Sequence, residues 1–340
     1  MSHDADRLSE RGLLVLPRLR VQNANAISSP MTWGFPAISA FAGLMTALSR
    51  KLGPAASVAF SGFGVLCHGF DPQVTEHGNP RRFRLTRNPA LRDGRPPAIV
   101  EEGRAHLDVT LVFAVGLSAD AIDQGSRQAL AEQIADQVSQ LRVAGGSIVP
   151  RSDVPQARQR PYLWLMPPEA EEGRKAMRRL MRRWLPGYAL VCRDDLLHKR
   201  HAEMQQACPQ ASLYDAWLGL SRWTHRAVQQ TTVDSRTGQS LTEVRWARDP
   251  RDGWLVPIPV GYGALSPLYE PGTVSGARDT HTPARFVESV YSIGQWISPH
   301  RLRRVEDLLW FPDYDDTTGV YRCINSYADT PAPSDIQGEI

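Results

Sequence analysis

HLDVTLVFAVG (106–116) is the stretch that decides the fold. It alternates polar and apolar residues at first and then becomes fully apolar, as in a strand that is buried in a sheet. LLVLPRLRV (13–21) has the same character. SVAFSGFGVLCHGF (57–70) is also strand-like, and its glycines predict bulges or a close backbone approach. Three such strands predict a core built on a sheet.

Two amphipathic helices are expected between and after these strands. One begins near Ser39 and ends at Gly53, and the other runs over 126–143 and stops before Gly145-Gly146. Residues 71–104 form a long excursion from a hairpin. The order is therefore strand, helix, strand, excursion, strand and helix, which matches the first part of a ferredoxin-like unit, the platform of RNA-recognition modules.

We therefore predict an α+β fold with a ferredoxin-like (RRM-type) body over 1–150, from which the excursion 71–104 protrudes as a thumb hairpin. Residues 151–230 form a mixed region that adds a helical part, including a basic helix over 169–185. Residues 231–340 supply C-terminal strands and a helix that complete the body.

The second half contains shorter elements. In chain order we expect strands at 162–166 and 188–192, helices at 194–207 and 212–228, a loop or hairpin at 229–253, an edge strand plus loop at 254–269, a helix over 286–297, and two pairing strands at 308–311 and 319–323. The last dozen residues are expected to fray.

Composition excludes several classes of protein. Of the 340 residues, 42% are hydrophobic and 22% charged, which predicts an ordinary globular chain, and its length favours two packed lobes. No apolar run approaches the ~20 residues of a membrane span, and no secretory signal is visible. The four cysteines are scattered without a CxxC pair, which favours a reducing cytoplasm over a disulfide or zinc framework.

The basic residues are almost all arginines. Net charge is only +3, but three of the 39 basic residues are lysines and the other 36 are arginines. Arginine binds phosphates with two parallel hydrogen bonds and stacks on bases, which lysine does not do. A GC-rich genome would also produce this bias, so the number of arginines alone does not indicate a function, and their positions in the sequence have to be considered.

The first arginine cluster lies in the excursion, where seven arginines between 81 and 104 face three acidic residues. In an extended ribbon Arg82, Arg84 and Thr86 share one face, and Phe83 and Leu85 the other. This predicts a finger with a side that faces RNA phosphates and a side that packs. The alternative is a solvated loop.

The second cluster is the basic helix. Its cations recur on one face, and its apolar residues lie on the other, at Met177, Leu180, Met181, Trp184 and Leu185. Mutual repulsion among the cations favours an anionic partner, either nucleic acid or an acidic protein surface. An anionic membrane fits less well, because the apolar stripe is narrow. A plain solvated face is the alternative.

Two polar segments are further candidates. The loop QNANAISSPMTWGFP (22–36) offers Asn and Ser side chains to RNA, and Trp33 and Phe35 for stacking on bases. AGGSIVP (144–150) could hold a phosphate with its backbone amides, although paired glycines after a helix are often only a C-cap.

Catalysis has little support. His68 and His106 could act as general base and acid in metal-independent RNA cleavage, but structural histidines are the more common explanation. The acidic group at Asp313, Asp315 and Asp316 lacks the glycine and distal glutamate of a calcium loop. We expect no metal and no cofactor.

Four long motifs resemble one family. They are 22–36, LTRNPALRDGRPPAIVEEGRAHLDV (85–109), LRVAGGSIVP (141–150) and GWLVPIPVGYGALSPLY (253–269). They resemble the second Csy subunit of the type I-F CRISPR surveillance complex (Cascade), which belongs to the Cas "five" lineage of repeat-associated, ferredoxin-fold proteins.

The resemblance implies a non-catalytic role in the bacterial cytoplasm, in antiviral DNA targeting. Such a subunit grips the 5′ handle of the guide RNA, pairs with the large Csy subunit as a heterodimer, and caps the filament of the backbone Csy subunit. Target double-stranded DNA is a further candidate partner. A metal-independent endoribonuclease that processes the guide precursor is the alternative function.

Motifs and resemblance together give the candidate residues. Those expected to bind RNA are Arg20, Asn23, Asn25, Ser28, Ser29, Trp33, Arg82, Arg84, Arg87, Asn88, Arg104, Gly145, Gly146 and Ser147. Those expected to contact DNA or a partner are Arg174, Lys175, Arg178, Arg179, Arg182 and Arg183.

Overall fold

The computed structural model describes residues 8–329 except 77–80, 88–89, 92, 122, 167–170, 234–239, 250 and 278. Within that part of the chain, eleven strands form one antiparallel sheet, in the order β10-β11-β1-β9-β4-β13-β17-β16-β19-β18, with β12 added on β1. The last strand also pairs with β4 through Trp310 and Phe63, so this half of the sheet curls back on itself.

The strands of this sheet are β1 (Leu8–Asn25), β4 (Val58–Pro72), β9 (Arg104–Ser118), β10 (Arg142–Val143), β11 (Gly146–Val149), β12 (Tyr162–Leu165), β13 (Tyr188–Cys192), β16 (Trp254–Ala264), β17 (Val287–Ile297), β18 (Trp310–Asp315) and β19 (Val320–Asn325). The helices are α1 (Ile38–Leu52), α2 (Gln124–Ser139), α3 (Gln156–Gln159), α4 (Glu171–Arg183), α5 (Asp194–Ala207) and α6 (Leu213–Ser221), with 3-10 turns at Ala119–Ala121, Pro299–Arg301 and Glu306–Leu308.

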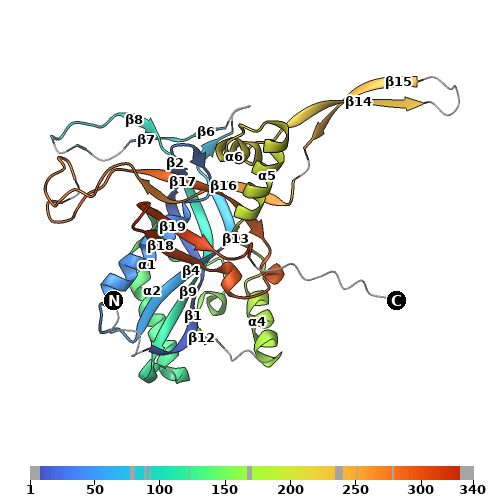
Figure 1. Cartoon of the computed structure of the whole chain (residues 1–340). Coiled ribbons are helices and arrows are strands. Elements are labelled where there is room, and N and C mark those ends of the chain that lie inside the picture. The colour runs from blue at the N-terminus through green and yellow to red at the C-terminus, as the bar shows by residue number, and fades with distance from the viewer. Residues whose placement is uncertain are drawn as a thin grey trace.

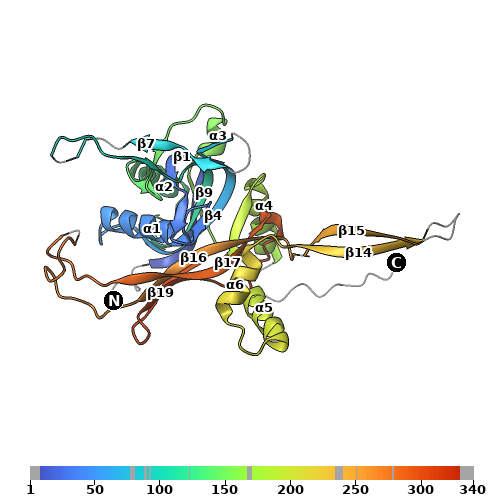
Figure 2. The same ribbon diagram turned by 90° about the horizontal axis from the view of Figure 1, so that it is seen from above.

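Side chains of the central strands alternate between two cores. Leu14 and Leu16 of β1 pack with α1 and α2 on one face, whereas Leu13 and Val15 pack with α4 on the other. This period of two follows from strand geometry. On the same face as α4, α5 and α6 pack on β16 and β17 through Trp217 and Ile293. Figure 2 shows the two groups of helices on opposite sides of the sheet.

An arm and a hairpin project from this body in opposite directions, and the connection between β16 and β17 projects on the same side as the arm (Figures 1 and 2). The arm, residues 73–103, connects β4 to β9 and carries β5 (Val74–Thr75), β6 (Arg82–Phe83), β7 (Leu85–Arg87) and β8 (Ile99–Glu101). The hairpin consists of β14 (His225–Val233) and β15 (Ser240–Arg248). The turn formed by β2 (Ile27–Ser29) and β3 (Thr32–Trp33) stays close to the body.

Most of the expected elements are present. The strand and helix predictions in the first half are confirmed, except that α2 ends at Ser139 and residues 142–143 form β10 instead of the last helical turn. The arm does leave and rejoin two neighbouring antiparallel strands. The bulges expected near the β4 glycines occur between Phe60 and Gly62 and between Cys67 and Gly69. The fold is thus a mixed α and β architecture that is dominated by an antiparallel sheet, with few helices.

The helix expected over 286–297 is wrong, because this segment is strand β17. Its apolar residues fit helical spacing by coincidence. Every residue over 292–297 is buried, because β17 lies between β13 and β16 and has helices or strands on both faces. Buried strands of this kind lose the polar and apolar alternation that marks half-exposed ones.

The edge position expected for 254–269 is also wrong, because β16 lies between β17 and β19. Its prolines at 257 and 259 pair only with β17, since the pairing of β16 with β19 covers only Gly261–Gly263. A Cβ at position 261 would lie 1.9 Å from the carbonyl oxygen of Tyr321, so glycine is required where the strands approach.

The helix expected over 212–228 ends at Ser221, because β14 begins at His225 and pairs with β15. The hairpin alternative for 229–253 is therefore correct, with an earlier start. No helix in the described ranges is long and apolar enough to cross a membrane.

Candidate nucleic-acid interface

The loop over 22–36 is folded by its own side chains. The hydroxyl of Thr32 lies 2.7 Å from those of both Ser28 and Ser29, and Ser29 is buried. The side chain of Asn25 donates to the carbonyl of Ile27 (2.8 Å) and accepts from its N–H (3.0 Å). These bonds are local turn interactions that fix the path of the backbone.

Asn23 shapes the same loop through its backbone. It has a positive φ of 56°, a conformation that asparagine tolerates better than most residues. Its N–H donates to Nδ1 of His106 (3.2 Å), and its carbonyl accepts from the guanidinium of Arg104 (3.4 Å). The expected RNA-binding residues Asn23 and Arg104 therefore lie together at the start of the loop.

The glycine turn packs against this loop. The carbonyl of Ala144 accepts from the N–H of Asn25 (2.8 Å), and Ala144 and Gly145 both have positive φ. A Cβ at Gly146 would lie 2.7 Å from the backbone of Ala24, so a glycine is needed there. The C-cap alternative is wrong, because α2 ends at Ser139 with Gln140 as its C-cap, and the glycines connect β10 to β11. Ser147 is exposed in β11, beside Gln22.

Loop and turn converge with the start of α1 around one open groove of about 580 Å³. Its polar lining includes Asn25, Ser28, Ser39, Arg142 and Gly145. No side chain in the described part of the protein caps the N-terminus of α1, and Ala37, Ser39 and Ala40 at that end of the helix line the groove. We refer to this hollow as the groove.

Arg142 is the residue of the groove that sequence reasoning missed. Its guanidinium donates to the carbonyl of Gly145 (3.1 Å), which holds a cation at the turn. The signal was present in the sequence, because Arg142 stands directly before the turn in the motif over 141–150.

A second hollow, of about 520 Å³, lies next to the loop and is largely aromatic. Trp33 is 60% exposed at its rim, and Phe35, Tyr188, Trp254 and Trp296 line it. Tyr188 and Trp254 pack edge to face at 5.4 Å, and both are about half exposed. Sequence reasoning found Trp33 but not Tyr188 or Trp254, which come from strands far away in the chain.

Part of the cationic face that was predicted for the arm is exposed in the structure. Arg82 and Arg84 are exposed, and within the described ranges neither meets a carboxylate; Arg84 donates to the side chain of Gln73 (3.3 Å). Arg104 instead bonds Glu102 at 2.9 Å, which neutralises its charge. Asn88 lies outside the described residues, as does the side chain of Arg87.

The predicted packing side of the arm is only half correct. Phe83 packs edge to face on Trp33 at 5.7 Å, but Leu85 is 68% exposed, so its expected burial is wrong. The short pairing of β7 with β8 stands clear of the body and leaves Leu85 without a surface to cover it.

Arg20, an expected RNA-binding residue in β1, is exposed and lies 4.0 Å from Asp153.

Helix α4 has the expected two faces. Leu180, Met181 and Trp184 are buried in the core that α4 shares with β1. The exposed cations of this helix are Lys175, Arg178, Arg179, Arg182 and Arg183. The guanidinium of Arg183 lies over the ring of Tyr162 at 4.6 Å. Leu185, expected in the apolar stripe, is 39% exposed because it follows the helix; the side chain of Arg174 lies outside the described residues.

The two candidate catalytic histidines take part in hydrogen bonds within the protein. Nδ1 of His68 lies 2.5 Å from the carbonyl of Pro186, and Nε2 lies 2.8 Å from the hydroxyl of Thr110, so both ring nitrogens are engaged. Burial lowers the pKa of His68 below its usual value, which favours the neutral ring. Among the described residues, no group of His, Cys, Asp and Glu is arranged to hold a metal.

The fold and the groove define the class of protein: an arginine-rich scaffold built on one antiparallel sheet, with loops that surround an open groove. The family of CRISPR-associated proteins described as Cas_Csy2 matches residues 14–323. A relative, CRISPR-associated protein Csy2 of Pseudomonas aeruginosa (strain UCBPP-PA14), is 44% identical over 316 residues, which cover 91% of this chain and 94% of the relative. The chain belongs to the Csy2 family of CRISPR-associated proteins. The resemblance found in the sequence motifs is confirmed at this level.

Proposed function

We propose that this protein is a non-catalytic, RNA-binding subunit of a type I-F Csy effector complex (Cascade) in the bacterial cytoplasm. It grips the 5′ handle of the guide RNA, pairs with the large Csy subunit and caps the backbone filament. The observation that carries the RNA-binding part is the convergence of the loop, the glycine turn and the start of α1 around one groove.

The groove supplies three kinds of phosphate ligand. The uncapped amides of α1 and its dipole attract an anion, the turn at Gly145 exposes backbone, and Arg142 adds a fixed charge. The aromatic hollow beside it offers Trp33, Tyr188 and Trp254 as surfaces on which an unstacked base packs. Together they accept a single-stranded RNA end.

The arm extends this surface. Arg82 and Arg84 would contact the RNA backbone, whereas Arg104 acts within the loop because Glu102 already neutralises it. In this role the protein recognises charge and shape, and base pairing of the guide recognises sequence.

We assign the scaffold to the ferredoxin-like class. In its support, the strands β11, β1, β9 and β4 lie in that order, all antiparallel, and α1 and α2 cover one face. These strands and helices follow the chain order that the sequence motifs predicted for such a unit.

Binding of RNAs with and without the native 5′ handle tests the proposal. Fluorescence anisotropy with the full-length protein should give tighter binding of the RNA that carries the handle. Arg142→Gln should remove most of this preference, because it deletes the fixed cation of the groove. Arg301→Gln, which removes an equal charge from an exposed turn on another part of the body, is the matched control. Equal binding of the two RNAs by the unmodified protein would contradict the proposal.

A further inference from the structure

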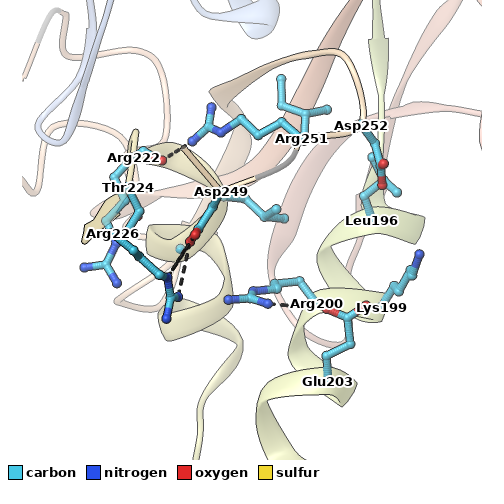
Figure 3. Close-up of a pocket in the computed structure, with 13 residues that line it drawn as sticks. Leu196, Lys199, Arg200, Glu203, Arg222, Thr224, Arg226, Asp249, Arg251 and Asp252 are labelled. Carbon is cyan, nitrogen blue, oxygen red and sulfur yellow. Dashed lines mark hydrogen bonds and ion pairs between the residues drawn. The ribbon is translucent and has the colours of Figure 1, made fainter. Parts of the chain in front are cut away.

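The hairpin joins the body at a pocket of about 380 Å³ between the hairpin and α5 (Figure 3). We call it the hairpin-root pocket. It is lined by five cations and three acids, namely Lys199, Arg200, Arg222, Arg226, Arg251, Glu203, Asp249 and Asp252. The pocket lies on the sheet face covered by α4, α5 and α6, and the groove lies on the face covered by α1. It is therefore separate from the interface described above.

Some of the charged side chains that line the pocket form ion pairs with one another. Arg226 pairs with Asp249 at 2.9 Å, and Arg200 pairs with Glu203 at 3.4 Å. Figure 3 shows both pairs on the walls, with the cations from the hairpin and from α5 facing one another. Lys199 and Arg222 are exposed and meet no carboxylate in the described ranges.

Arg251 is a cation held in place beside this pocket. It donates to the carbonyl of Arg222, and its guanidinium lies over the ring of Trp223 at 4.4 Å. Arg248 lies over the same ring at 4.3 Å. Burial first, and then the charge of Arg248, lower the pKa of Arg251. Two guanidinium groups around one ring repel each other, and a bound anion would relieve that repulsion.

The cations continue outward along the hairpin. Arg226 and Arg245 lie on one face of the paired strands, because they belong to cross-strand pairs two positions apart. Arg226 is paired with Asp249, and Glu243 lies on the same face two residues from Arg245, so Arg245 is the cation that this face adds to the pocket. Cations spread from a pocket onto a ribbon fit a chain of anions better than a single small ion. Guanidinium groups also match the geometry of phosphate oxygens.

We propose that the hairpin-root pocket binds the phosphodiester backbone of a nucleic acid, at a site separate from the groove. Lys199, Arg222 and Arg251 line different walls of the pocket (Figure 3), so each contacts a separate phosphate of the chain, and Arg245 on the hairpin contacts a further one. The backbone comes from either of two sources, the guide RNA beyond its handle or duplex DNA.

The test is anisotropy with two probes, fluorescein-labelled guide RNA and a labelled 20-base-pair DNA duplex, each titrated with the full-length protein over a salt series. At about 0.1 M salt the double variant Lys199→Gln/Arg222→Gln should bind one of the probes more weakly, by roughly tenfold for each phosphate contact that it loses. The slope of log affinity against log salt should also fall by about one for each lost contact. A weakening confined to the duplex identifies DNA as the ligand, and one confined to the RNA identifies the guide. The control pair Arg11→Gln/Arg301→Gln removes the same charge from exposed positions outside the pocket.

Two further variants keep the outcome interpretable. Lys199→Glu, a single change at an exposed position, should reproduce the weakening if the double variant is unstable. Arg142→Gln in the groove should leave duplex binding unchanged. Affinity and salt slope that stay at control values for both probes would overturn the proposal. The proposal is also overturned if the pocket variants bind both probes normally but no longer bind another protein subunit. An acidic protein surface would then be the partner.

Discussion

Arg151 illustrates how charge is buried in this protein. Its side chain is only 6% exposed, and its guanidinium bonds Asp108 at 2.9 Å and Asp153 at 2.6 Å. Arg18 shares the carboxylate of Asp108. The hydrogen bond from Arg151 lowers the pKa of Asp153 to about 2. This network ties β1 and β9 to the segment that follows β11.

Asp153 should therefore stabilise the protein in a pH-dependent way. Its folded pKa lies below the value of about 3.9 in an unfolded chain. The stabilisation is thus present above about pH 4 and is lost as the pH falls toward 2. Urea unfolding between pH 5 and pH 2 should show a shallower loss of stability for Asp153→Asn than for the unmodified protein. Identical pH profiles would show that the ion pair does not contribute.

His68 and His106 should not support RNA cleavage. Both nitrogens of His68 are hydrogen-bonded, and Nδ1 of His106 accepts from Asn23. His106 also lies four residues along β9 from Thr110, the partner of His68, which is roughly 13 Å at strand spacing. Repeat RNA incubated with the protein in a chelator should stay intact on a denaturing gel. Cleavage that disappears in both His68→Ala and His106→Ala would favour the endoribonuclease.

At the scale of elements, the arm should contribute to the salt dependence of RNA binding. Arg82→Gln/Arg84→Gln should lower the slope of log affinity against log salt by about 0.7 for each phosphate that the arm no longer neutralises. Arg104→Gln is the matched control, since Glu102 already neutralises that charge. Slopes measured by anisotropy that are equal for the two variants would assign the arm arginines to a solvated loop.

Elements were predictable where a single face is buried. Polar and apolar residues alternate in part of β1, and apolar residues form a stripe along α1 and along α4. These patterns predict a strand and two helices correctly, because one side of each element packs on a core. The pattern of β17 wrongly predicts a helix because the sheet buries this strand on both faces. The cations of the arm and α4 were found from local pattern, whereas Arg142, Tyr188 and Trp254 act through neighbours that no local pattern indicates.

At the scale of the whole molecule, the hairpin should be dispensable for folding. Arg226 and Ala247 face each other across β14 and β15, so an Asn-Gly turn can join them in place of 227–246. The hairpin projects away from the body, and an isolated two-stranded ribbon adds little stability. The melting temperature should change by less than about 2 °C.

Trp217→Ala is the comparison for that deletion. Trp217 is buried between α6 and the sheet, and its indole N–H donates to the carbonyl of Ser292 at 3.0 Å. Its truncation should destabilise the protein by about 3–5 kcal/mol. A hairpin deletion that lowers the melting temperature as much as Trp217→Ala would mean that the hairpin is part of the folding unit.

The order of the sheet was not predictable beyond its first four strands. Strand β13 pairs with β4 and β17, and β18 returns to β4, so these pairings join segments more than a hundred residues apart. Composition and periodicity identify strands but do not identify their partners when no short turn connects them.

The central sheet also acts as a partition. It places the groove and the hairpin-root pocket on opposite faces, with helices and their apolar cores between them. Such a separation is wide compared with the ~8 Å over which dissolved salt screens charge. If both proposed sites bind nucleic acid, this arrangement would let one small protein hold two negatively charged polymers with little repulsion between them.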